Sequence, residues 1–152
     1  MYDEALKFAG QNRSKIIVTT NGVFDILTVA HVAYLKKARA LGDILIVLLN
    51  SDSSVKRLKG DKRPINNMAD RKMVLESLRF IDKVFIFNED DPRKILEEIQ
   101  PNIHVKGGDY NITQIIERKV VEANKGRVVL LDKIEGVSTT NIINEIVKRY
   151  GK

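Results

Sequence analysis

The chain of 152 residues carries a net charge of +6, is 43% hydrophobic and 30% charged, and contains no cysteine. This length and composition predict a single globular domain with its own core. The lack of cysteine excludes disulfides, thiol catalysis and cysteine-ligated zinc, and is typical of a cytoplasmic protein. Since no apolar run reaches the ~20 residues that cross a bilayer, and the N-terminus does not resemble a signal peptide, we expect no membrane contact.

The positive charge suits a polyanionic ligand. Only 6% of the residues are aromatic, and basic and aromatic side chains do not alternate in any repeat. Nucleic-acid binding is therefore not favoured. We expect a small phosphorylated substrate as the partner instead.

Hydrophobic runs alternate with helical spacings along the chain. Strands are predicted over residues 15–20, 44–50, 83–87, 103–106 and 127–131. Helices are predicted over residues 30–41, 69–80, 92–99, 112–123 and 139–150. Residues 56–67 form one long basic loop, predicted to be a mobile lid. This order predicts an α/β fold, a doubly wound, five-stranded parallel Rossmann-like sheet with helices on both faces, in one domain over residues 1–152.

Ligands of doubly wound sheets bind beyond the carboxyl ends of the strands, at the switch point of the winding. The first strand is followed by the segment 21–31, which leads into a helix. Free N–H groups and the helix dipole favour a phosphate there, and His31 adds an imidazole donor. Thr28 and His31 share a helix face, although Thr28 equally suits a plain N-cap and His31 a partly buried surface position. Gly22 permits a close backbone approach, and Asp25 supplies a carboxylate beyond the strand.

Two further strand ends carry candidate binding turns. Gly107 and Gly108, followed by Asp109, suit a base or ribose against bare backbone, or a simple turn. Ser138 and Thr139 follow a glycine at a helix start, where they suit an anion site or an ordinary cap.

A cluster of cations lies between these strand ends. It comprises Lys56, Arg57, Lys59, Lys62 and Arg63, followed by Arg71 and Arg79 on the next helix. Such a run serves either as a phosphate clamp or as a solvated face.

Several familiar motifs are missing from the sequence. The Walker motif, a Gly-x-Gly-x-x-Gly after the first strand and a Gly-x-Ser-x-Gly elbow are all absent. These absences argue against a P-loop enzyme, a dinucleotide dehydrogenase and a serine hydrolase. Two histidines far apart do not make a histidine-rich metal cage, and the metal ligands stay open.

Taken in order, these pieces resemble the nucleotidyltransferase superfamily marked by a His-x-Gly-His motif. Within it the chain is most similar to the bacterial heptose-1-phosphate adenylyltransferases of ADP-heptose synthesis. The similarity covers residues 16–146, and its most specific stretches are 20–27, 50–52, 56–64, 105–110 and 138–143. Glycerol-phosphate cytidylyltransferases share the general frame, including residues 135–140.

The resemblance implies transfer of AMP from ATP to a sugar 1-phosphate, with Mg²⁺ and release of pyrophosphate. It implies catalytic roles for Thr28, His31, Lys59 and Arg71. It implies nucleotide binding by Asn21, Gly22, Val23, Phe24, Ala30, Lys106, Gly107, Gly108, Asp109, Ser138, Thr139 and Thr140. It implies contacts with the acceptor or with phosphate for Asp25, Lys56, Arg79 and Lys133. A homodimer is the assembly that the family suggests, and twofold pairing is the commonest closed assembly.

One departure from the family pattern affects the chemistry. Where the family has His-x-Gly-His, this chain has Thr28-Val29-Ala30-His31. Pantetheine-phosphate adenylyltransferases also begin this motif with threonine, but the alanine adds a Cβ where the family has none. Because loss of one transition-state donor costs ~10²–10³ in rate, reduced activity and an altered substrate are both expected alternatives.

Three functional hypotheses stay open. The first is an active adenylyltransferase that makes ADP-heptose for lipopolysaccharide core synthesis. The second is a nucleotide-binding protein with weakened catalysis. The third is an adenylyl- or cytidylyltransferase for another phosphorylated acceptor, such as glycerol 3-phosphate.

Overall fold

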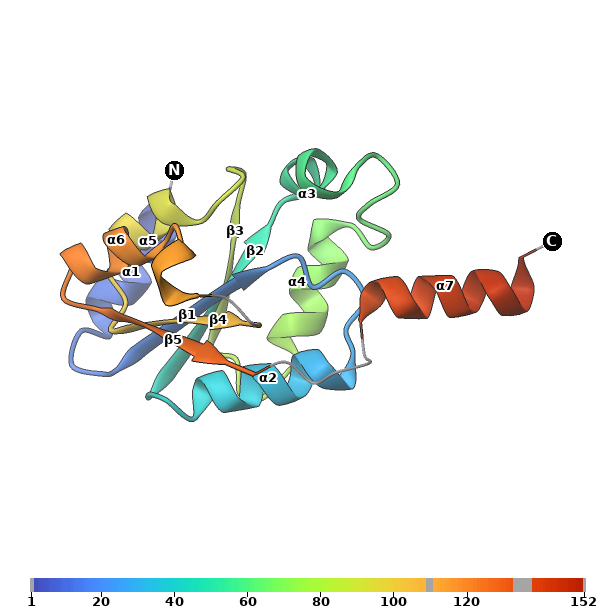
Figure 1. Cartoon of the computed structure of the whole chain (residues 1–152). Helices are drawn as coiled ribbons and strands as arrows, with labels where there is room; N and C mark the ends of the chain where they lie inside the picture. Colours follow the sequence, from blue (N-terminus) through green and yellow to red (C-terminus); the bar gives the residue numbers. More distant parts are fainter. Residues whose placement is uncertain (1, 109–110, 133–137, 152) are drawn as a thin grey trace.

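The computed structural model describes residues 2–108, 111–132 and 138–151 and shows a parallel sheet between two layers of helices (Figure 1). The strands are β1 (Ile17–Gly22), β2 (Ile44–Asn50), β3 (Lys83–Phe87), β4 (Ile103–Gly107) and β5 (Arg127–Leu131). Their order is β3-β2-β1-β4-β5, and every neighbouring pair is parallel. The predicted fold class is confirmed.

Helices cover both faces of the sheet, as Figure 1 shows. On one face lie α1 (Asp3–Gln11), α5 (Arg93–Ile99) and α6 (Arg118–Ala123), and on the other lie α2 (Val29–Arg39) and α4 (Met68–Glu76). Each face has its own apolar core, with Ile46 and Leu48 in one and Leu45 and Val47 in the other. The continuous apolar run of β2 is buried along its whole length because both of its faces are covered.

Two helices lie where none was predicted. The first is α1, which buries Ala5 and Ala9 and packs Phe8 against the same core. The second is α3 (Asp52–Lys59), which takes up the first part of the expected basic loop. The Ser51 hydroxyl caps α3 by accepting from the Ser54 N–H. The basic side chains in the last turn of α3 interact favourably with the negative end of the helix dipole.

The helix predicted over residues 112–123 is interrupted. A short 3-10 turn, η1 (Ile112–Gln114), comes first, and α6 starts only at Arg118. Between them Ile115 adopts an extended ψ of 111° and inserts its side chain into the core. Burial of this one side chain overrides the helical spacing of the sequence.

The last helix, α7 (Thr139–Tyr150), extends away from the body (Figure 1). Ile146, Val147 and Tyr150 on it are exposed. No helix in the described part of the chain is long and apolar enough to cross a bilayer.

Candidate active site

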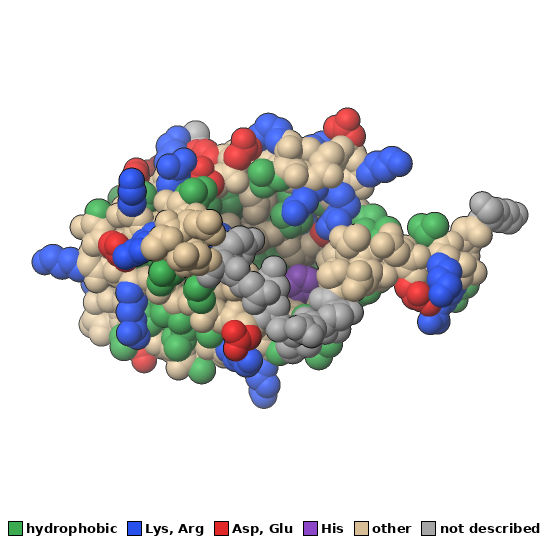
Figure 2. Space-filling view, in the orientation of Figure 1, with side chains coloured by type: hydrophobic (Ala, Val, Ile, Leu, Met, Phe, Trp, Pro, Cys, Tyr) green, Lys and Arg blue, Asp and Glu red, His purple; other side chains and the backbone are tan. Residues whose placement is uncertain are grey.

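A cavity of about 780 Å³ lies at the carboxyl ends of β1 and β4, where the winding of the sheet reverses. Figure 2 shows this hollow between the body and α7, with a histidine side chain inside it. His31 lines this cavity, whereas His104 is fully buried. The structure brings most of the predicted residues to the cavity wall, namely Asn21, Gly22, Val23, Phe24, Asp25, Ala30, His31, Lys59, Lys106, Gly107, Ser138, Thr139 and Thr140.

Other predicted residues do not line this cavity. Among the described residues these are Thr28, Lys56, Arg71, Arg79 and Gly108. Asp109 and Lys133 lie outside the described residues. Arg79 follows the end of α4 and precedes the first residue of β3, so it lies at the amino end of the sheet, opposite the cavity. The prediction that Arg79 binds substrate phosphate is not supported, because a crossover helix runs antiparallel to the strands and carries its last turn away from the site.

His31 occupies the third position of α2, and its ring faces back toward the N-cap. The Thr28 backbone N–H donates to His31 Nδ1 at 3.1 Å, and the Thr28 hydroxyl lies 3.0 Å from the same nitrogen. A ring nitrogen that accepts from a backbone N–H carries no proton, so these contacts assign the neutral tautomer with the proton on Nε2. Burial lowers the pKa of His31, which favours the same neutral form. His31 therefore offers an Nε2–H donor to a ligand in the cavity.

Thr28 acts on the site through His31. Its side chain accepts from the His31 backbone N–H at 3.4 Å as the N-cap of α2, and the residue is only 8% exposed. These contacts occupy the Thr28 hydroxyl within the cap of α2, and its expected direct contact with phosphate stays a prediction.

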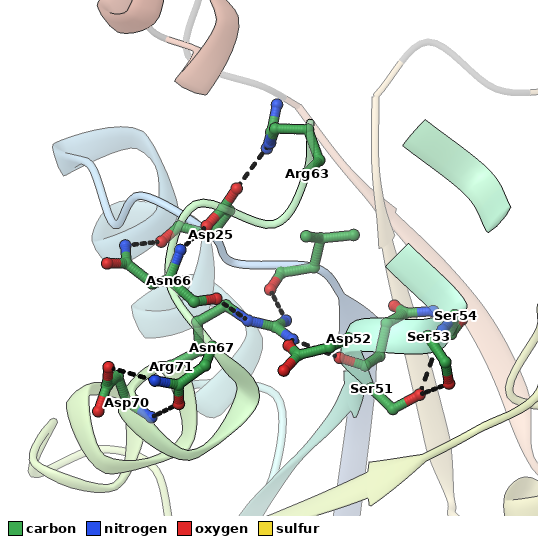
Figure 3. Close-up of polar contacts among 12 residues, drawn as sticks. Asp25, Ser51, Asp52, Ser53, Ser54, Arg63, Asn66, Asn67, Asp70 and Arg71 are labelled. Carbon is green, nitrogen blue, oxygen red and sulfur yellow. Dashed lines mark hydrogen bonds and ion pairs between the residues drawn. The ribbon is translucent and has the colours of Figure 1, made fainter. Parts of the chain in front are cut away.

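Arg71 is a buried brace rather than a free cation (Figure 3). Its guanidinium donates to the carbonyls of Val23 at 2.6 Å, Asn50 at 2.9 Å and Asn66 at 3.0 Å, and to the Asp52 carboxylate at 2.8 Å. These four acceptors come from the ends of β1 and β2, the start of α3 and the segment before α4. Four of the five guanidinium N–H groups join those segments, and Arg71 does not line the cavity, so this arrangement gives Arg71 a structural role and does not support its predicted contact with phosphate.

Asp25 anchors the second part of the expected lid (Figure 3). Its carboxylate accepts from Arg63 Nε at 2.6 Å and from the backbone N–H groups of Ile65 and Asn66, each at 2.8 Å. Burial alone would raise the pKa of Asp25, but these hydrogen bonds outweigh it and hold the pKa below its usual value. Asp25 thus places Arg63 at the cavity wall, where the sequence suggested a direct contact between Asp25 and substrate.

The N-terminus of α7 is tied to the segment that precedes α2. The Thr139 hydroxyl donates to the Ile26 carbonyl at 3.3 Å, and the Ser138 hydroxyl accepts from the Asn141 N–H at 3.1 Å. Two helix N-termini, those of α2 and α7, therefore border the same cavity. Both favour anions.

Tyr34 of α2 explains the glycine at the end of β4. Its hydroxyl contacts Thr20 Oγ1 at 2.7 Å and donates to the Val105 carbonyl at 3.1 Å, and burial raises its pKa to about 12. A Cβ at Gly107 would lie 2.9 Å from the Tyr34 ring, so only glycine fits this contact without displacement. Tyr34 stays a neutral part of the cavity wall.

Most charged groups of the cavity wall are already paired. Lys106 contacts Glu117 at 2.7 Å, and Arg63 contacts Asp25. Asp90 forms an ion pair with Arg57, and Asp91 forms one with Arg93. Neither of these two arginines lines the cavity. Within the described part of the chain, Lys59 is the cation of the wall that forms no ion pair. Lys59 is thus available to a phosphate.

Glu117 was missed in the sequence. It lies on the cavity wall and is 3% exposed. Nothing in the local pattern distinguishes it from a solvated acid, because its partner Lys106 lies on another element, across the unrecognised break in the helix.

Comparison with known proteins shows the family to which this chain belongs. The pattern described as cytidylyltransferase-like matches residues 19–145. The chain belongs to the cytidylyltransferase-like family. The bifunctional protein HldE of Citrifermentans bemidjiense is 52% identical over 139 residues, which cover 91% of this chain and 28% of that protein. The HldE of Geobacter sulfurreducens is 48% identical over 144 residues, covering 95% of this chain and 29% of that protein.

This cytidylyltransferase-like chain also matches a solved structure. The lipopolysaccharide core biosynthesis protein of Thermoplasma volcanium has a TM-score of 0.65 and 28% identity, and the match covers 79% of this chain and 97% of that one. The chain spans less than a third of the HldE relatives. The predicted membership in the nucleotidyltransferases is confirmed, and the chain is a nucleotidyltransferase.

A cytidylyltransferase-like site needs hydrogen-bond donors and cations that bind phosphate more than it needs a set of protein metal ligands. Among the described residues, no three His, Cys, Asp or Glu side chains gather where they could hold a metal ion. The wall instead combines a neutral His31 donor, two helix N-termini and the unpaired Lys59. This arrangement suits the binding of a polyphosphate and the stabilisation of charge on it.

Proposed function

We propose that this domain transfers AMP from ATP to heptose 1-phosphate, releasing pyrophosphate and forming ADP-heptose for lipopolysaccharide core synthesis. The observation that carries the proposal is the His31 Nε2–H donor, aimed from the N-terminus of α2 into a cavity that α7 and Lys59 also border. The resemblance to heptose-1-phosphate adenylyltransferases supports the choice of acceptor. So do the HldE relatives and the lipopolysaccharide core protein of T. volcanium.

The transfer requires no general base. An oxygen of the acceptor phosphate is already an anion, and it attacks the α-phosphorus of ATP. The bond from that phosphorus to the α–β bridging oxygen breaks, and pyrophosphate leaves with the electron pair. Catalysis then consists of in-line positioning and of stabilising the negative charge that moves to the leaving group.

The chain's own groups divide this work. His31 Nε2–H and the first N–H groups of α2 donate to the α-phosphate. The N-terminus of α7, with Ser138, Thr139 and Thr140, binds the β- and γ-phosphates. Lys59, which lines the same cavity as Arg63, binds the acceptor phosphate. Mg²⁺ bound with the nucleotide would lower the negative charge of the phosphates, and phosphate oxygens and water would supply most of its ligands.

The test is pyrophosphate release from ATP or CTP across a panel of acceptors that includes heptose 1-phosphate, other sugar 1-phosphates and glycerol 3-phosphate. We expect release with ATP and heptose 1-phosphate. Release with CTP and glycerol 3-phosphate would favour a cytidylyltransferase instead. Tight ATP binding without pyrophosphate release with any acceptor would identify a nucleotide-binding protein. This alternative is kept because Thr28 and Ala30 stand where the family motif has histidine and glycine.

A further inference from the structure

A polar subsite lies on the wall formed by β1, β4 and the segment before α6. Lys106 Nζ donates to Asn21 Oδ1 at 3.0 Å and to Glu117 Oε1 at 2.7 Å. All three residues line the cavity. One ammonium therefore fixes the orientation of an amide and of a carboxylate at the switch point of the sheet.

Both partners of Lys106 keep unused hydrogen-bonding capacity. In the described part of the chain, only Lys106 donates to the Glu117 carboxylate, which leaves Oε2 without a donor. Likewise, the Asn21 amide turns its oxygen to Lys106, and its NH₂ group donates no hydrogen bond to a described residue. A carboxylate that is 96% buried at its side chain and has one free oxygen requires a donor from a ligand or from water.

The charge of this wall disfavours phosphate. Glu117 neutralises Lys106, and the carboxylate oxygen of Glu117 that Lys106 does not contact would repel the oxygens of a phosphate. The phosphate-binding groups, by contrast, are the α2 and α7 N-termini and Lys59. A free carboxylate oxygen beside a fixed amide N–H suits neutral hydroxyl groups, which both donate and accept.

We propose that Asn21, Lys106 and Glu117 form a subsite for a vicinal diol of a bound substrate, with Glu117 accepting from the hydroxyls and Asn21 donating to one of them. This inference rests on the proposed function, in which both substrates carry such a diol: the ribose of ATP and the ring of the sugar 1-phosphate. The chemistry is shared, and binding measurements distinguish the two sources.

The experiment compares wild type with Glu117→Gln, which keeps the size of the side chain and an oxygen for Lys106 but replaces one acceptor with a donor. Calorimetry measures the Kd of ATP, 2′-deoxy-ATP and 3′-deoxy-ATP. A second series measures the Kd of heptose 1-phosphate in the presence of a non-hydrolysable ATP analogue. If the ribose occupies the subsite, wild type binds ATP about 10- to 100-fold more tightly than the deoxy forms, and Glu117→Gln loses that preference. If the acceptor occupies it, only the Kd of heptose 1-phosphate rises by about that factor.

Glu122→Gln is the matched control, because Glu122 forms an exposed ion pair with Arg118 on α6, away from the cavity wall. If Glu117→Gln does not fold, Asn21→Ser removes the amide donor while leaving the Lys106–Glu117 pair in place, and the same comparison applies. Unchanged affinities for ATP, its deoxy forms and heptose 1-phosphate would overturn the proposal. None of these measurements needs turnover, so a failure of pyrophosphate release in wild type would count against the proposed function alone.

Discussion

The Thr28 backbone N–H donates to Nδ1 of His31 at 3.1 Å, so a main-chain group decides which imidazole nitrogen carries the proton. This contact does not depend on the Thr28 side chain. A threonine at the first position of the family motif therefore leaves the orientation of the second histidine intact.

His31→Ala should lower kcat by about 10²–10³-fold while weakening ATP binding much less, because the Nε2–H is used mainly as charge develops. His31→Gln places an amide N–H near the position of Nε2, whereas His31→Asn places one near Nδ1. We expect kcat to fall less in the glutamine variant than in the asparagine variant. Equal losses in kcat and in ATP affinity would reduce His31 to a binding residue. Single-turnover kinetics and calorimetry make the comparison.

Thr28→Val should lower the free energy of unfolding by about 1 kcal/mol, since it removes the N-cap of α2. The expected loss in kcat is less than about tenfold, because the backbone donor to His31 remains. Thr28→Ser, which keeps the cap, is the control. A large loss in kcat at unchanged stability would show instead that the hydroxyl contacts phosphate.

Arg71→Ala should destabilise the fold by roughly 3 kcal/mol or more, because it leaves Asp52 and three carbonyls without their donor. Arg79→Ala, in the exposed segment after α4, should change stability by less than about 0.5 kcal/mol and leave kcat unchanged. Urea denaturation of both variants checks the pair. Wild-type stability of Arg71→Ala with weakened ATP binding would restore Arg71 as a phosphate ligand.

Lys59→Ala should raise the KM of the acceptor by about tenfold, an effect that shrinks as salt is added. Lys62, on the same basic segment, does not line the cavity and provides the matched control as Lys62→Ala. Equal changes in both variants would indicate general attraction by the basic segment rather than a contact of Lys59.

His104 of β4 makes stability depend on pH. It is fully buried, with Nδ1 2.9 Å from Thr19 Oγ1, and burial, aided by the charge of Lys106, lowers its pKa to about 3. In the unfolded chain the pKa of His104 is near 6.5. The stability that comes from keeping His104 neutral is therefore complete above that pH and is lost as the pH falls from about 6.5 toward 3. Between pH 7 and pH 5, wild type should lose about 2 kcal/mol of stability more than His104→Leu. Parallel pH profiles of the two proteins would contradict this.

The sequence was sufficient for the sheet and for the location of the site. The apolar run of β2 and the alternation of strands with helices predict a doubly wound sheet, and the edge at which such a sheet binds its ligand follows from that topology. The segments after β1 and β4 and before α7 meet there as expected.

Roles of individual side chains were less predictable. Lys59 and Arg71 are both cations near the same strand ends. Lys59 lies on the cavity wall without an ion pair to any described residue, whereas Arg71 is buried and donates to backbone carbonyl groups. Tertiary packing, which the spacing of charges does not encode, separates them. The α2 cap also escapes the usual pattern, because His31 stands where Glu or Gln normally completes a capping box.

The anchoring of residues 63–66 by Asp25 has a thermodynamic consequence for substrate binding. A basic segment that is disordered in the free protein must lose backbone entropy when it closes over its ligand, at about 1–2 kcal/mol per residue. Here three donors from the segment are already held by one buried carboxylate, so that entropy is lost during folding instead. Arg63 is therefore pre-organised on the cavity wall, and the interaction energy of the acceptor is retained as affinity.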